Sequence, residues 1–155
     1  MKLQISKYKC GNCENEFRAP QIRSGVYAEF LLRSSSTDGV SYLDAMDDQT
    51  YEEVDILLKS NSRLAGMSAN VLAKILQKCY GTIACDPDSN GNTFQIGAHP
   101  ACPFCGSQSM TYWEVVEPPE YLEKNVPPVT HFNWLSMSDN EKAKKVDQVL
   151  AGFGY

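Results

Sequence analysis

Alternating apolar and polar residues predict two hairpins in the first third of the chain. Residues 7–17 have the pattern of a strand, a tight Gly-Asn turn and a second strand. Residues 26–33 alternate again, and after a serine-rich turn the extended pattern resumes over 40–43. We expect the tip of this second hairpin at Asp38 and Gly39.

Helical spacing of apolar residues follows in the middle of the chain. Thr50 and Glu53 have the spacing of a capping box, in which each side chain satisfies a free backbone amide of the other residue. This pattern predicts a helix near 51–60. A second helix is predicted to begin at Ser68 and to end at Gly81, because glycine readily adopts the left-handed conformation that terminates helices.

The rest of the chain predicts short strands and one more helix. Extended segments are expected at 82–84, 93–96 and 110–113. Four prolines then bracket an irregular crossing segment. A capping box that starts at Ser138 opens a final helix over about 139–151, and the narrow apolar stripe of this helix places it on the domain surface.

The cysteines add chemistry to this pattern. Four of the six form two C-x-x-C pairs, Cys10 with Cys13 and Cys102 with Cys105. No segment approaches the roughly 20 apolar residues of a membrane span, and the amino end lacks the apolar core of a signal peptide. We therefore expect a cytoplasmic protein with no membrane partner, in which thiols serve metals more often than disulfides. The four thiolates are predicted to hold one structural zinc ion.

Both cysteine pairs resemble a known class of metal site. Residues 102–106, Cys-Pro-Phe-Cys-Gly, are similar to the C-P-x-C-G knuckle of zinc ribbons and rubredoxin-like domains, and residues 10–13 resemble their first knuckle. The resemblance covers about ten residues at each place and matches no specific family. Glu14 departs from it, because glycine is common there, and 88 residues separate the knuckles where a few tens is usual. The resemblance implies a zinc-ribbon-like antiparallel sheet.

Two other uses of these cysteines stay open at this point. Iron also binds tetrahedral four-sulfur sites, and rubredoxin-like knuckles use it for electron transfer. Taken alone, residues 102–105 resemble a glutaredoxin active site, whose first cysteine is a low-pKa nucleophile at a helix start. The compact surroundings of a rubredoxin are missing, so zinc is favoured over iron. The residues after Cys105 have the pattern of a turn and a strand, not of a helix, so thiol oxidoreductase chemistry comes last.

The remaining thiols and both histidines have structural interpretations. Cys79 and Cys85 lack C-x-x-C spacing, and we expect them to be buried free thiols. His99 lies three residues before the second cysteine pair, but four cysteines already complete a tetrahedron, so we expect it to pack or hydrogen-bond near the site. His131 has no complementary nucleophile nearby in the sequence and is predicted to pack or to lie on the surface.

A polar segment, 86–92, imitates the start of a calcium loop. Oxygen-bearing residues stand at alternate positions and a glycine stands sixth. The twelfth position is Gly97, where a bidentate glutamate is required, and strands instead of helices are expected on both sides. We therefore predict an Asx-rich hairpin turn.

Length and composition define the fold class. A chain of 155 residues with 43% apolar and 21% charged residues is typical of one globular domain, 1–155. We predict an α+β domain with the first knuckle at 7–18, an inserted hairpin and two helices over about 19–97 and the second knuckle at 99–114. The C-terminal helix, about 139–151, is expected to dock on this assembly.

Charge and motif content then suggest the type of function. The net charge is −5, and no phosphate-binding loop, serine nucleophile pattern or histidine-based metal motif is present. We expect a non-enzymatic, zinc-stabilised binding or regulatory protein that acts through protein–protein contacts, for example an acidic antagonist of immunity type that covers a basic partner. The candidate partner surface is an acidic stretch around the first predicted helix: Asp44, Asp47 and Asp48, followed by Glu52, Glu53 and Asp55.

A nucleic-acid-binding zinc ribbon is the alternative. Basic residues gather around the first knuckle, although four thiolates and a zinc ion sum to a charge of −2 that nearby cations also offset. Under this alternative the nucleic acid would contact Lys2, Lys7, Lys9, Arg18 and Arg23.

Overall fold

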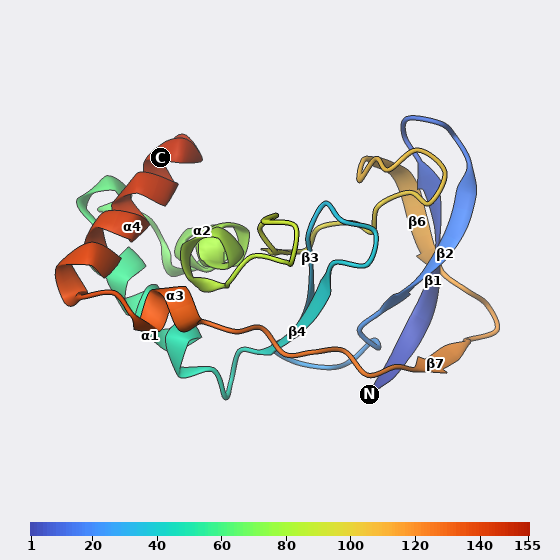
Figure 1. Cartoon of the computed structure of the whole chain (residues 1–155), viewed down its shortest axis with the longest axis horizontal. Coiled ribbons are helices and arrows are strands. Elements are labelled where there is room, and N and C mark those ends of the chain that lie inside the picture. The colour runs from blue at the N-terminus through green and yellow to red at the C-terminus, as the bar shows by residue number, and fades with distance from the viewer.

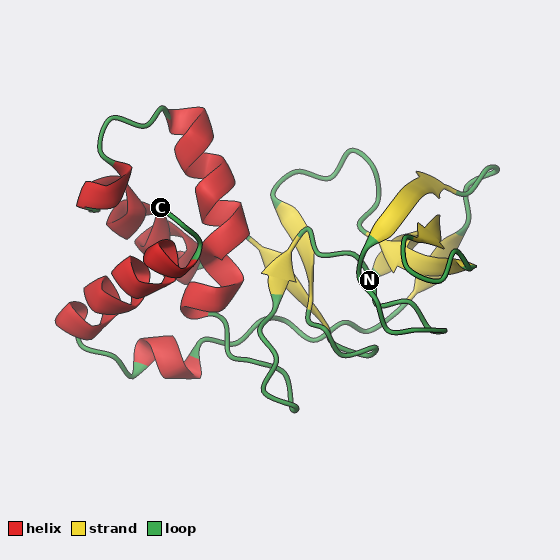
Figure 2. Ribbon diagram, turned by 90° about the horizontal axis from the view of Figure 1, so that it is seen from above, coloured by secondary structure: helices red, strands yellow, loops and turns green.

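In the computed structural model, which describes residues 1–155, two antiparallel sheets and a group of helices follow one another along the long axis of the molecule (Figure 1 and Figure 2). The sheet at one end, called here the ribbon sheet, has the strand order β2-β1-β6, and a short strand pairs with the start of β1. Its strands are β1 (Lys2–Cys10), β2 (Glu16–Gln21), β6 (Met110–Val115) and β7 (Tyr121–Glu123).

A smaller sheet, called here the central sheet, lies between the ribbon sheet and the helices (Figure 1). Its order is β4-β3-β5, with strands β3 (Glu29–Arg33), β4 (Val40–Asp44) and β5 (Gln95–Ile96). The segment that leads from the ribbon sheet back to the helices, called here the return path, runs along the edge of the central sheet. The Tyr42 amide donates to the Pro127 carbonyl at 2.9 Å, and the Val129 amide donates to the Tyr42 carbonyl at 2.9 Å.

The helices gather at the other end of the molecule, where the carboxy terminus also lies (Figure 1). They pack with the inner face of the central sheet around 17 buried residues that include Leu32, Val54, Tyr80 and Trp134. By contrast, the buried apolar cluster on the ribbon side has three members, Leu3, Leu31 and Val126. The helices are α1 (Gln49–Ser60), α2 (Ala69–Ala84), α3 (Phe132–Leu135) and α4 (Asp139–Gly152), with a 3-10 turn η1 (Ser62–Leu64).

The structure confirms a mixed helix and sheet architecture with both predicted hairpins. The first strand of the second hairpin begins at Glu29, later than residue 26, because the chain turns through positive φ at Gly25 and Ala28. The C-terminal helix starts with the predicted capping box at Ser138. Within the predicted assembly it packs on the two inserted helices, α1 and α2, and not on the ribbon sheet.

The cap of α1 differs from the prediction. Asp48, not Thr50, is the N-cap, and its Oδ1 accepts hydrogen bonds from the Thr50 amide at 2.9 Å and the Tyr51 amide at 3.1 Å. Thr50 is buried inside the first turn. Glu53 points to the other helices instead, where Oε1 accepts from Lys142 and Oε2 accepts from Trp134.

The end of α2 also differs. The helix continues past Gly81 to Ala84, so the strand predicted at 82–84 was wrong. The apolar spacing continues through Ile83 and Ala84, which both join the helical core. Gly81 is needed for close approach and not as a cap, because a Cβ there would lie 1.7 Å from the carbonyl oxygen of Phe94.

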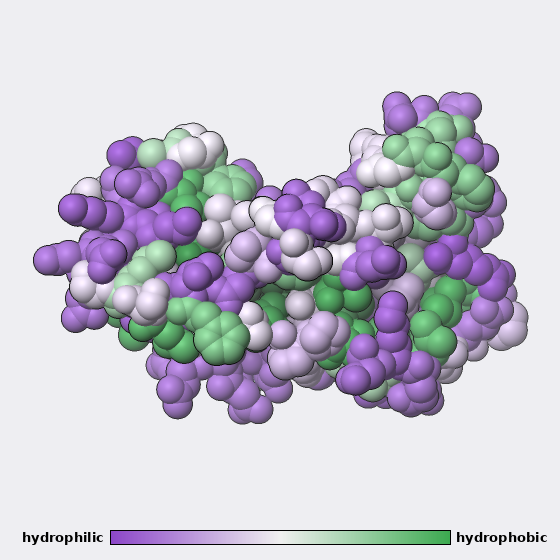
Figure 3. All heavy atoms as spheres, viewed as in Figure 1, coloured by the Kyte–Doolittle hydropathy of each residue, from purple (hydrophilic) through white to green (hydrophobic).

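None of the helices combines the length and the apolar character that crossing a membrane requires. The longest, α2, has 16 residues. The apolar surface on the face shown in Figure 3 is limited to patches between hydrophilic areas, and one of them lies beside α3, where Phe132 is 76% exposed.

Alanine at Gly81 is expected to destabilise the fold by about 3 kcal/mol or more, because the methyl group would overlap the Phe94 carbonyl and force α2 away from residues 94–96. Gly152→Ala is the matched control, since nothing lies within 4 Å of its Cβ position. That variant should be neutral or more stable by up to about 1 kcal/mol, through helix propensity. Urea unfolding of both variants measures the difference, and equal effects would contradict the close-approach role.

Candidate metal centre

The first cysteine pair lies in the turn that joins β1 to β2. The Cys10 amide donates to the Asn15 carbonyl at 3.0 Å, and the Cys10 carbonyl accepts from the Glu14 amide at 3.1 Å. Glu14 has a φ of 62°, in the left-handed region that favours glycine. The position where knuckles commonly have glycine therefore keeps the glycine conformation in this chain, although the residue is glutamate.

The second cysteine pair, Cys102 and Cys105, lies in a turn of the same kind. The Cys102 amide donates to the Ser107 carbonyl at 2.8 Å, and the Cys102 carbonyl accepts from the Gly106 amide at 2.7 Å. Gly106 has a φ of 80°, so it corresponds to Glu14 of the first turn. The two turns thus share one backbone conformation. A hydrogen bond of 2.7 Å from the Gly11 amide to the Ser109 carbonyl holds them together.

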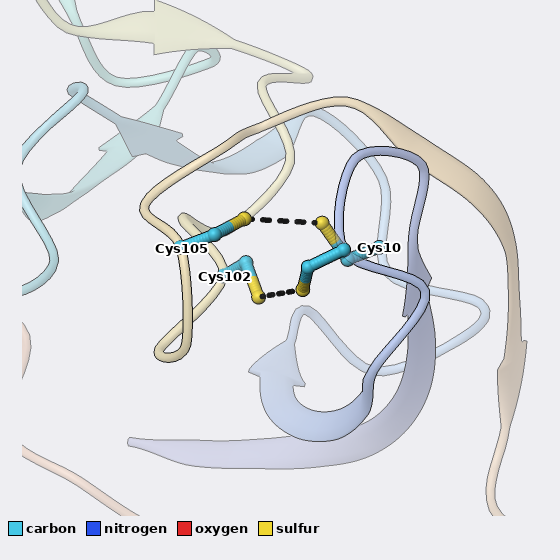
Figure 4. Close-up of side chains that lie close together, drawn as sticks. Cys10, Cys102 and Cys105 are labelled. Atoms are coloured by element: carbon cyan, nitrogen blue, oxygen red, sulfur yellow. Dashed lines mark hydrogen bonds between the residues drawn. The ribbon is translucent and has the colours of Figure 1, made fainter.

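The four sulfur atoms converge between the two turns (Figure 4). The Sγ of Cys10 lies 3.5 Å from that of Cys105, and the Sγ of Cys13 lies 3.6 Å from that of Cys102. All four sulfurs are within 4.8 Å of one another. A tetrahedron with metal–sulfur distances of about 2.3 Å has sulfurs about 3.8 Å apart, whereas a disulfide requires about 2.05 Å. The cluster therefore fits a bound metal ion and not a pair of disulfides.

Nearby N–H groups already favour thiolates at two of the four positions. Hydrogen bonds from the backbone and side chain of Asn15 lower the pKa of Cys13. The Asn12 side chain, followed by a backbone N–H, lowers the pKa of Cys105 to about 6. Burial instead raises the pKa of Cys102 to about 11. A divalent cation would hold all four as thiolates, because metal binding displaces the thiol protons.

The other cysteines and His99 lie outside this cluster. Cys79 and Cys85 are buried free thiols in the helical core, as predicted, and burial raises the pKa of each. The ring centroid of His99 lies 4.3 Å from that of Trp113, so this histidine packs beside the ribbon sheet.

His131 has a larger structural role than its sequence context suggests. Its Nδ1 lies 2.7 Å from the Ala84 carbonyl oxygen, and its Nε2 lies 2.8 Å from Oδ2 of Asp48. The Tyr80 hydroxyl lies 3.2 Å from the same Nε2. The carbonyl and the carboxylate are acceptors, so this arrangement favours hydrogen on both ring nitrogens, which is the imidazolium form. No sequence signal places residue 131 beside residue 48.

Burial alone lowers the pKa of His131, but the hydrogen bonds to Asp48 and Ala84 outweigh it and leave the pKa raised. Burial raises the pKa of Asp48, but the hydrogen bonds from His131 and from the two amides that Asp48 caps outweigh burial and leave the pKa lowered. The pair thus joins the start of α1, the end of α2 and the start of α3.

The acidic candidates have different roles. Oδ1 of Asp44 accepts from the Met46 amide at 3.1 Å, and Asp48 has the cap and the ion pair described above. Asp47 is exposed. Of the three aspartates predicted to meet a partner, Asp47 is the one whose carboxylate has no structural contact.

Two of the five basic candidates around the first knuckle, Lys7 and Arg18, are paired with carboxylates. Lys7 lies 3.7 Å from Glu16 and 3.9 Å from Glu114, and Arg18 lies 2.8 Å from Glu120. These pairs are half exposed, and each adds little stability. Their positive charge is nonetheless balanced locally, which lowers the attraction for phosphates.

The polar segment 86–92 is an Asx-rich turn, but it is not the predicted hairpin, because α2 precedes it and β5 pairs with β3. Asp88 accepts from the hydroxyls of Ser34 and Ser36 at 2.6 and 2.7 Å, and from two amides of its own turn. Asp86 accepts from the Phe132 and Asn133 amides at 2.8 and 3.0 Å, so it satisfies the start of α3. These carboxylates therefore serve structural hydrogen bonds.

Replacing His131 by glutamine is expected to cost about 2 kcal/mol of unfolding free energy at pH 6, because Asp48 loses a largely buried cation. The raised pKa of His131 makes its contribution complete below the ordinary histidine value near 6.5, and this contribution is lost as the pH rises through the folded pKa. Denaturant unfolding at pH 6 and pH 9 should show that the difference in unfolding free energy between the wild-type protein and His131→Gln becomes smaller as the pH rises.

His99→Gln is the control for this prediction. Burial, and then the charge of Arg33, lowers the pKa of His99. The difference in unfolding free energy between the wild-type protein and His99→Gln should therefore become larger, not smaller, as the pH rises. A difference for His131→Gln that stays constant between the two pH values would show that His131 is not protonated in the folded protein.

Comparisons of the chain with protein-family models, with curated proteins and with solved structures find no match. The function is therefore inferred from the side chains and their arrangement. The structure establishes a mixed helix and sheet protein with four cysteines clustered within metal-binding distance.

Proposed function

We propose that the protein is a non-enzymatic, zinc-stabilised binding or regulatory protein that acts through protein–protein contacts. The observation that carries the metal part is the convergence of four sulfurs from two equivalent turns. Four protein ligands complete a tetrahedral zinc shell and leave no position for a substrate, which is the pattern of a structural site.

We propose zinc in preference to iron as the metal, and the exposure of the site is compatible with this choice. Phe104, between the two cysteines of the second turn, is 64% exposed, and Cys105 is exposed as well. The reduction potential of an iron–sulfur centre depends on solvent exposure and on the shell around the sulfurs. An open edge of this kind suits a metal that only holds the chain together.

A groove beside α1 supports the protein-binding part of the proposal. It has a volume of about 440 Å³ between the start of α1 and the start of α2, with Ala73 and Leu76 among its apolar lining residues. Asp47, Glu52 and Asp55 line it as well, and Lys59 is the one cation among the lining residues. The groove is therefore acidic around an apolar lining.

The edge of this groove has exposed apolar side chains. Met46 is 71% exposed and lines both the groove and a neighbouring hollow of about 390 Å³. Tyr27, which lines the second hollow, is 82% exposed. Large exposed apolar side chains beside an acidic groove are compatible with a protein interface, because aromatic residues and methionine are enriched in such interfaces. The chemistry fits a basic partner with an apolar anchor.

Metal analysis of the full chain should give about one zinc ion per protein, and serine at any of the four clustered cysteines should lower that value. Cys79→Ala is the control and should keep its zinc, because Cys79 lies in the helical core. Iron in place of zinc would give visible absorbance. Unchanged zinc in all four Cys→Ser variants would contradict the site.

Chelation should disorder the ribbon sheet while the helical end stays folded, because a buried cluster of three residues on that side cannot replace a metal that contributes on the order of 10 to 16 kcal/mol. The two tryptophans report on the two ends, since Trp113 lies in β6 and Trp134 in the helical core. After chelation the indole NMR signal of Trp113 should shift or broaden, and that of Trp134 should stay.

Charge reversal at Asp47 and Glu52 should slow the association of a partner recovered by affinity purification by about tenfold at low salt, with a smaller effect at high salt. Glu123→Lys on the ribbon sheet is the control and should leave the rate unchanged. If a Lys7, Lys9 and Arg18 variant instead loses tight, salt-dependent binding to DNA or RNA, the nucleic-acid alternative is correct.

A further inference from the structure

Arg33, the last residue of β3, is a buried cation without a carboxylate partner. It is 6% exposed. The structure has eight salt bridges, and Arg33 belongs to none of them. Its side chain makes a single hydrogen bond, in which Nη2 donates to the carbonyl oxygen of Pro20 at 2.5 Å. Most N–H donors of the guanidinium thus have no partner in the protein.

These free donors border open space. Every fully enclosed side-chain nitrogen or oxygen in the structure has a hydrogen-bond partner, so the unbonded nitrogens of Arg33 are not enclosed by packed protein. Arg33 lines a cavity of about 440 Å³ between the ribbon sheet and the turn after β3. Because an unpaired buried charge is costly, a counter-ion in this cavity would stabilise Arg33.

The charge of the cavity wall also favours an anionic ligand. Arg18, Arg33 and Lys124 line the cavity, and Asp38 is the one acidic residue that does so. This gives the wall a net charge of +2 in a chain whose net charge is −5. Arg18 is already paired with Glu120, whereas Lys124 is exposed and makes no salt bridge, so Arg33 and Lys124 are the two cations available to a ligand.

The metal centre helps to form this cavity. Pro100, Ala101 and Pro103, which flank Cys102 in the sequence, line it. Val126 and Pro127 of the return path line it as well. The cavity wall therefore combines residues of the second cysteine turn with residues of the central sheet and the return path.

We propose that this cavity binds a small oxyanion, a carboxylate or a phosphate, with the Arg33 guanidinium as its main contact and Lys124 at its mouth. A guanidinium offers parallel N–H groups that match two oxygens of either anion. The structure thus assigns to the chain a small-molecule site that is separate from the groove beside α1 and does not depend on a protein partner.

The test is calorimetric titration of the zinc-loaded full chain with inorganic phosphate and with succinate, at constant ionic strength in chloride. One or both should bind with one site per chain, and the stronger anion identifies the ligand class. Arg33→Met should raise the Kd about tenfold or more, and Arg33→Lys, which keeps the charge but loses the fork, should raise it about threefold or more. Lys124→Ala should weaken binding, whereas the control Lys144→Ala on α4 should not.

A direct readout covers the case in which Arg33→Met does not fold. In the wild-type protein the Nε–H NMR signal of Arg33 should move during the phosphate or succinate titration, and Lys124→Ala should reduce the affinity relative to Lys144→Ala. If neither anion binds, if the Arg33 signal does not move, or if folded Arg33 variants bind unchanged, the proposal is wrong.

Discussion

The convergence of four cysteine sulfurs is the constraint on which the ribbon end of the molecule depends. Thiolates 3.5 to 3.6 Å apart repel one another unless a cation lies between them, so the arrangement is stable with a metal ion and strained as a set of free thiolates. The two turns are distant in sequence, and closing so long a loop has a large entropic cost. A buried apolar cluster of three residues on this side could not offset that cost.

The helical end is held by different forces. Its core is large and apolar, and polar side chains at the helix ends fix how the helices meet. Asp48 with His131 joins α1 to the start of α3, and Glu53 joins α1 to Lys142 and Trp134 of the later helices. The acidic residues of this region are thus partly structural, and the proposed partner surface is smaller and more sharply placed than the whole acidic stretch.

Local patterns in the sequence predicted the local structure well. Both cysteine turns, the second hairpin and the capping box at Ser138 depend on residues within a few positions of one another, and the structure has all of them. The errors came from contacts between distant segments. Gly81 looked like a helix end because the nearby Phe94 carbonyl cannot be read from the sequence, and Asp48 and His131 are 83 residues apart. The burial of Arg33 was hidden for the same reason.

Strand β3 is buried on both faces, and this has a mechanical consequence. Leu31 belongs to the small cluster on the ribbon side, whereas its neighbour Leu32 belongs to the helical core. A slip of β3 by one residue would exchange the two leucines between the cores. Neither end of the molecule can therefore shift along this strand without disturbing the packing of the other, so the register of β3 is fixed from both of its faces.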